Sequence, residues 1–145
     1  MRPVQPALAG LGLLAALLAG CGSSTPPSLV LSCSRHKLPS GALRIAARVR
    51  NSAHARQDAL LFGSALSYVT HEYPALTTRQ VMVNTAGKSS PYIALLVPRI
   101  KAGGVARILL RFKSPPHSAT LGVAIPAHRH GATLSGPTCL VTRHA

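Results

Sequence analysis

Residues 42–50 read Ala-Leu-Arg-Ile-Ala-Ala-Arg-Val-Arg, and the order of side chains in this stretch decides the fold class. Apolar side chains occupy every second position, at Leu43, Ile45, Ala47 and Val49. The positions between them hold Arg44, Ala46, Arg48 and Arg50. A period of two is that of a β-strand with one face buried and the other in water. We therefore predict a strand with an apolar face and a face made mostly of arginine.

The same alternation returns in residues 105–112. Its two sets of positions are Ala106, Ile108, Leu110 and Phe112, and Val105, Arg107, Leu109 and Arg111. Further candidate strands are residues 29–33, 78–84, 92–97, 119–125 and 138–142. Residues 59–70 are apolar on both faces, which fits a buried strand or a short helix. Their end at Tyr68-Val69-Thr70 is aromatic and β-branched, which favours a strand.

Turn residues separate these segments, at Asn51-Ser52, Ala86-Gly87, Gly103-Gly104 and Pro115-Pro116. The pattern gives seven to nine short strands in about 115 residues, and no segment after residue 28 is typical of a long helix. Such spacing suggests a sandwich or a barrel. We expect a single all-β domain over residues 29–145, an immunoglobulin-like or related antiparallel β-sandwich.

Two segments carry a resemblance that bears on this fold. Residues 44–52, Arg-Ile-Ala-Ala-Arg-Val-Arg-Asn-Ser, form a strand pattern that ends in Asn-Ser. Residues 96–112 read as a strand, a loop with Gly103-Gly104, and a strand that ends in Phe112. This order is similar to that of the immunoglobulin-like domains on many bacterial lipoproteins. The resemblance implies a non-catalytic binding or spacer module.

The N-terminus has the pattern of an export signal. Arg2 precedes an apolar run from Ala7 to Ala19, which is shorter than the roughly 20 residues of a membrane-spanning helix. The run ends in Leu18-Ala19-Gly20-Cys21, which resembles the lipobox of bacterial lipoproteins at all four positions. The resemblance implies a signal helix over residues 1–20, cleavage before Cys21, lipid on Cys21, and a tether over residues 21–28. An ordinary signal peptide with a chance cysteine is the alternative.

The resemblance implies that the domain is exported and lies outside the cytoplasm. The lipid on Cys21 would then hold it on the membrane, because two or more acyl chains anchor a protein stably. Gly22 follows the cysteine where, in enteric-type bacteria, an Asp favours retention in the inner membrane. The resemblance therefore favours an outer-membrane anchor that faces the periplasm.

Cys33 and Cys139 are the two cysteines left once Cys21 carries lipid. A single pair in an exported domain reads as a disulfide. Two independent buried cysteines are the alternative.

Charge limits the chemistry that this chain can perform. It has 16 Lys and Arg but only 2 acidic residues, Asp58 and Glu72, for a formal net charge of +14. Carboxylate pairs and carboxylate-rich cation sites have almost no supply of ligands. We expect a non-enzymatic protein without a cofactor. The scarcity of acids also suits an acidic compartment, and the excess of arginine suits a GC-rich genome.

Histidine offers one compact group, His128-Arg129-His130. Two His at i and i+2 of a strand share a side and are able to hold copper or zinc. The group lies between Pro126 and Gly131, which predicts a solvated loop instead. If the two histidines do hold a metal ion, the protein is a periplasmic copper- or zinc-binding protein, which stays as an alternative function.

Arginine provides a second candidate site, made of Arg44, Arg48, Arg50, Arg107 and Arg111. If the two arginine-bearing strands are neighbours, these side chains form one basic surface, and guanidinium suits phosphate and carboxylate. The alternative is that they are simply the solvated side of half-buried strands.

We expect an envelope protein, anchored through lipid on Cys21, that binds or positions another envelope component. A polyanion such as lipopolysaccharide, bound through the arginine surface, is the alternative partner. Nucleic acid fits less well, because an extracytoplasmic domain does not meet cytoplasmic DNA and stacking aromatics are few.

Overall fold

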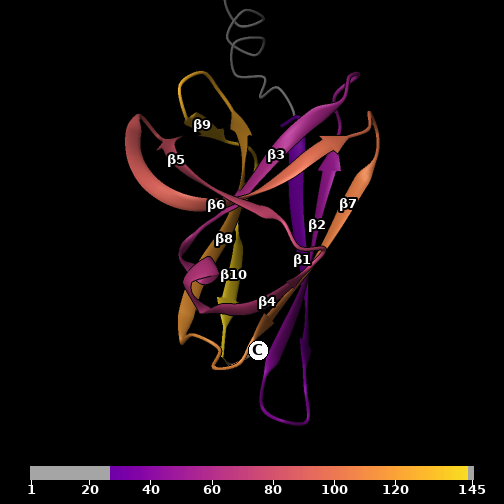
Figure 1. Cartoon of the computed structure of the whole chain (residues 1–145), viewed down its shortest axis with the longest axis vertical. Helices are drawn as coiled ribbons and strands as arrows, with labels where there is room; N and C mark the ends of the chain where they lie inside the picture. Colours follow the sequence, from indigo (N-terminus) through magenta and orange to yellow (C-terminus); the bar gives the residue numbers. More distant parts are fainter. Residues whose placement is uncertain (1–26, 144–145) are drawn as a thin grey trace, which may run out of the picture.

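The computed structural model describes residues 27–143. Its two β-sheets pack face to face (Figure 1). The first sheet has the order β1 (Leu29–Lys37), β2 (Leu43–Asn51), β7 (Val105–Phe112) and β4 (Val69–Tyr73). The second has the order β10 (Cys139–Thr142), β8 (Ser118–Pro126), β3 (Gln57–Phe62), β6 (Lys88–Ile100), β5 (Thr77–Thr85) and β9 (Gly131–Leu134). The predicted all-β sandwich is confirmed.

The strand order is that of an immunoglobulin-like domain with additions. The order β1-β2-β7-β4 corresponds to A-B-E-D of the constant-type fold, and β3-β8-β10 corresponds to C-F-G. All the pairings within these two sets are antiparallel. The hairpin of β5 and β6 is inserted after β4 and extends the second sheet beyond β3, while β9 is inserted between β8 and β10.

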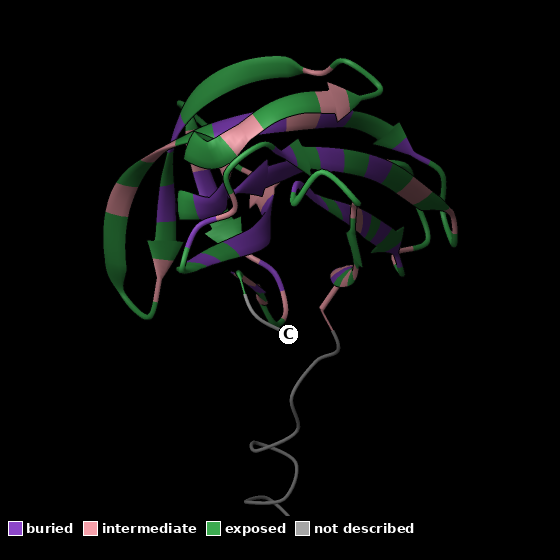
Figure 2. Cartoon of the chain, turned by 90° about the horizontal axis from the view of Figure 1, so that it is seen from below, coloured by how far each residue is buried: buried purple, intermediate pink, exposed green. Residues whose placement is uncertain are grey.

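Alternation in the sequence decides which side of each strand is buried. Figure 2 shows the strands banded in buried and exposed residues. The apolar positions of β2 and β7 enter the main core between the sheets, at Leu43, Ile45, Ala47, Val49, Ile108, Leu110 and Phe112. The arginines at the intervening positions of β2 and β7 are exposed. The predicted apolar and arginine faces are therefore both present.

A second, smaller core explains why residues 59–62 are apolar on both faces. Strand β9 pairs with β5 on one edge and with β8 on the other, which closes part of the second sheet into a ring. Leu60 and Phe62 point into this ring, where the Phe62 and Tyr92 rings meet edge to face at 5.0 Å. Ala59 and Leu61 point the other way, into the main core.

The prediction of one strand over residues 59–70 is wrong. Strand β3 ends at Phe62, a 3₁₀ helix, η1, covers Ser64–Tyr68, and β4 then starts in the opposite sheet. Gly63 makes this break possible, because its φ of 136° disfavours side chains and a Cβ there would collide with the backbone of Thr120. With this division and the short β9, the described residues contain ten strands instead of seven to nine.

Asn51 fixes the end of β2. Its buried side chain donates to the carbonyls of Ala55 at 2.8 Å and Ile100 at 2.9 Å, and its Oδ1 accepts from the backbone N–H of Ala53 at 2.9 Å. The sequence showed Asn51 only as the end of an alternating run. In the structure it joins the β2–β3 loop to the end of β6, because its amide satisfies backbone groups of both segments.

Within residues 27–143, no helix has the length and apolar character needed to cross a membrane.

Candidate anion-binding surface

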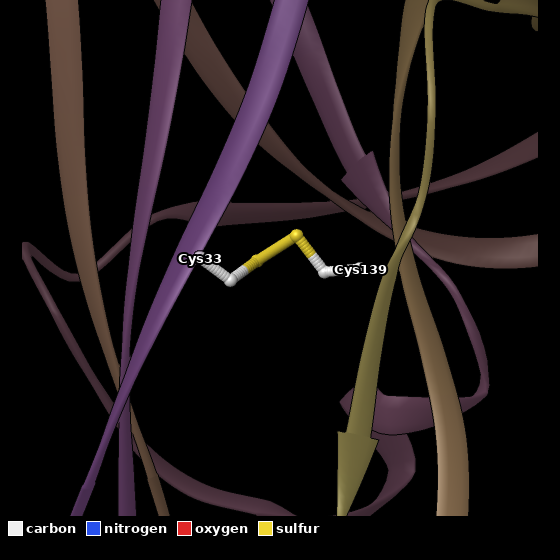
Figure 3. Close-up of a disulfide and its surroundings, with 2 residues drawn as sticks. All are labelled: Cys33 and Cys139. Carbon is white, nitrogen blue, oxygen red and sulfur yellow. A yellow bond between two sulfur atoms is a disulfide. The ribbon is translucent and has the colours of Figure 1, made fainter.

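The first and last strands are joined by the predicted disulfide. Cys33 of β1 and Cys139 of β10 are bonded across the two sheets, with their Cα atoms 6.2 Å apart and a sequence separation of 106 (Figure 3). Immunoglobulin domains of antibodies carry their disulfide between the second and sixth strands of this topology instead. Here the bond links the two ends of the described chain. Cys21, the predicted lipidation site, lies outside the described residues.

Strands β2 and β7 are neighbours, so the arginines come together on one surface. In the antiparallel register Arg44 lies opposite Arg111, Arg48 lies opposite Arg107, and Arg50 lies opposite Val105. All five predicted arginines are exposed on the outer side of the first sheet. We call this surface, made of Arg44, Arg48, Arg50, Arg107 and Arg111, the arginine face.

Two histidines extend the arginine face across the whole sheet. His36 of β1 pairs with Arg44, and His71 of β4 pairs with Arg111. One row therefore runs His36, Arg44, Arg111, His71 across all four strands. No sequence signal marked these histidines, because strand register depends on which strands pair and is not visible in the period of a single strand.

The row ends in a groove of about 640 Å³ lined in part by His71, Arg111 and Lys113. Ser40 and Thr70 add side-chain hydroxyl groups to its wall. Thr70 also donates from Oγ1 to the Arg111 carbonyl at 3.1 Å, which ties β4 to β7 beside the groove. The basic row therefore has one concave end.

Between the arginine pairs lies an uncharged strip. The next row of the register consists of Ser34, Ala46, Leu109 and Tyr73. Tyr73 is 69% exposed and Leu109 is 37% exposed. An exposed tyrosine flanked by cations is a suitable contact for a ligand that has both flat or apolar parts and anionic groups.

Nothing in the described residues neutralises the arginine face. Asp58 accepts a hydrogen bond from the backbone N–H of Arg99 at 2.7 Å, and Glu72 accepts one from that of Leu76 at 2.9 Å. Within residues 27–143 no carboxylate forms an ion pair with an arginine or lysine. Like charges directly opposite each other across two strands destabilise a sheet. The pairs Arg44–Arg111 and Arg48–Arg107 are therefore a cost to the isolated fold, one that a bound anion would lower.

The histidine group lies in a turn, as predicted. His128, Arg129 and His130 are exposed between β8 and β9, and Arg129 and His130 have positive φ. Because this is not a strand, the i and i+2 geometry of the metal hypothesis does not apply. In the part of the chain that the structure describes, no three His, Cys, Asp or Glu side chains are grouped so as to hold a metal ion.

No family model and no curated protein sequence matches the chain. Among solved structures it is similar to DesR, a β-glucosidase from Streptomyces venezuelae crystallised with D-glucose, with a TM-score of 0.37 and 12% identity. The match covers 79% of this chain but 15% of that enzyme, so the chain spans a small part of the enzyme's length.

Proposed function

We propose that this protein is a lipid-anchored, extracytoplasmic binding module that holds an anionic polymer of the cell envelope on its arginine face. The observation that carries the proposal is the register of like charges, Arg44 opposite Arg111 and Arg48 opposite Arg107, none of which forms an ion pair with a carboxylate of the described residues. In a sheet surface without a ligand, opposite charges at paired positions of two strands add stability. Here the paired positions of β2 and β7 carry like charges, which lower stability.

The chemistry of the arginine face fits a polymer that carries phosphate or carboxylate groups. Guanidinium binds either group through two parallel N–H bonds, and arginine remains charged at any physiological pH. The two charged rows lie on either side of the strip with Leu109 and Tyr73. A chain of sugars with anionic substituents, such as lipopolysaccharide, suits this alternation of rows.

Two features support the proposed location, the lipobox before the domain and the disulfide within it. The lipobox at Leu18-Ala19-Gly20-Cys21 supports export and a lipid anchor, with the outer membrane facing the periplasm as the favoured site. The Cys33–Cys139 disulfide supports an oxidising compartment. An anchored module close to the membrane is well placed to bind or position an envelope component.

Retention on immobilised anionic polymer tests the proposal. Heparin and lipopolysaccharide serve as probes, and the variant replaces Arg44, Arg48, Arg107 and Arg111 by Gln. The matched control replaces four exposed cations outside β2 and β7 by Gln, namely Arg79, Lys88, Arg99 and Arg129. Both variants have the same net charge.

We expect the variant of the arginine face to elute at much lower salt than the parent and the control to elute close to the parent. Equal elution of the two variants would mean that retention follows net charge alone, and it would discard the arginine face as the site.

A further inference from the structure

A second basic site lies at the end of the sandwich, next to the groove that ends the basic row, with which it shares Ser40, Lys113 and Ser114. The β1–β2 turn, the β7–β8 loop and the end of β10 enclose a groove of about 440 Å³. Its four cations are Arg35, Lys37, Lys113 and Arg143. Ser40 and Ser114 contribute hydroxyl groups to the same groove. We call it the end groove.

The two arginines of the end groove are held in place by hydrogen bonds to two backbone carbonyls and one side-chain hydroxyl group. Arg35 donates from Nη1 to Thr142 Oγ1 at 3.3 Å and from Nη2 to the Arg143 carbonyl at 3.0 Å. Arg143 donates from Nε at 3.3 Å and from Nη2 at 3.4 Å to the Pro115 carbonyl. A guanidinium has five N–H donors, so these bonds orient both groups and leave donors for a ligand. Orientation in advance lowers the entropy cost of binding.

The disulfide contributes to this arrangement. Arg35 follows Cys33 by two positions on β1, so both side chains project from the same side of the strand. Thr142 and Arg143 follow Cys139 along the last strand. The Cys33–Cys139 bond therefore keeps the two strands that bring Arg35 and Arg143 together.

We propose that the end groove binds a compact phosphorylated group, of the phosphomonoester or pyrophosphate class. The two oriented guanidinium groups match the paired oxygens of a phosphate, and the two lysines add point charges. Its volume falls in the range of small-molecule sites. The described residues supply no carboxylate that neutralises the four cations of the end groove. A ligand of this class would supply negative charge to neutralise them.

Calorimetric titration of the full exported chain with inorganic pyrophosphate tests the proposal. The variant carries Lys37→Gln and Lys113→Gln, because neither side chain forms a hydrogen bond within the described residues and the fold does not depend on them. The matched control carries Lys88→Gln and Lys101→Gln, two exposed lysines that do not line the end groove.

We expect saturable binding at one site for the parent and the control. The variant loses two contacts to a charged phosphate, each carrying roughly a factor of ten, so its affinity should be about a hundredfold lower. The Arg48→Gln, Arg107→Gln variant should retain the parent affinity for pyrophosphate, which separates this site from the arginine face. An absence of saturable binding, or equal weakening in variant and control, would overturn the proposal.

A second titration with glycerol 3-phosphate, the polar part of a phospholipid, identifies the source of the phosphate. If glycerol 3-phosphate binds saturably and more tightly than pyrophosphate, the proposal is supported and the ligand is a lipid headgroup. If glycerol 3-phosphate binds saturably but more weakly than pyrophosphate, the proposal is supported and the ligand is a phosphate that is free or carried on a polymer.

Discussion

Removal of the disulfide by Cys33→Ala and Cys139→Ala should destabilise the domain strongly. The bond closes a loop of 106 residues. In the chain-entropy account, a loop of that length lowers the entropy of the unfolded chain by about 16 cal/mol/K, which corresponds to about 4.8 kcal/mol at 25 °C. The entropy of unfolding is about 2.1 cal/mol/K per residue, or about 250 cal/mol/K for roughly 120 residues. Dividing the lost free energy by this entropy gives a fall in Tm of about 20 °C.

The measurement is urea unfolding followed by circular dichroism, for the parent with and without reductant and for the double variant. The reduced parent should unfold close to the variant, because both lack the same constraint and neither has lost a large apolar side chain. A loss of less than about 1 kcal/mol in the free energy of unfolding would contradict this prediction, since it would mean that the unfolded chain gains little freedom when the bond is absent.

Three further substitutions test the sheet itself. Arg48→Gln should raise the free energy of unfolding by about 0.2–1 kcal/mol in low salt, because it relieves repulsion from Arg107, and added salt should shrink the gain; a loss of stability would contradict this. Asn51→Ala should cost about 2–4 kcal/mol because buried carbonyls lose their donor, whereas Asn84→Ala, at an exposed position of β5, should cost little. Gly63→Ala should cost more than 2 kcal/mol, as measured by thermal unfolding, and a neutral result would exclude the backbone collision.

The strands that alternate cleanly could be assigned a buried and an exposed face, whereas the segment that is apolar on both faces was divided wrongly. In β2 and β7 one face meets the core and the other meets water, so the period of two is complete. Residues 59–62 lie between two cores and show no polar face, and the break at Gly63 depends on the approach of Thr120 from a distant strand. Local pattern carries no information on such an approach.

The candidate sites divide in the same way. The arginines of β2 and β7 could be identified from alternation, since each faces water on its own strand. The pairing of Arg44 with Arg111, and the rows completed by His36 and His71, depend on register. The end groove was missed because its four cations come from three separate segments of the chain, and Arg35 lies beyond the first strand predicted over residues 29–33.

The salt dependence of polymer binding shows how many arginines of the arginine face contact the polymer. The affinity of the parent, of the variant with Arg44, Arg48, Arg107 and Arg111 replaced by Gln, and of its charge-matched control is measured for one anionic polymer over a series of salt concentrations. Each cation that neutralises a charged group of the polymer releases a counterion, so its loss lowers the slope of log affinity against log salt by roughly one. We expect a markedly smaller slope for the variant alone. Identical slopes for variant and control would contradict it.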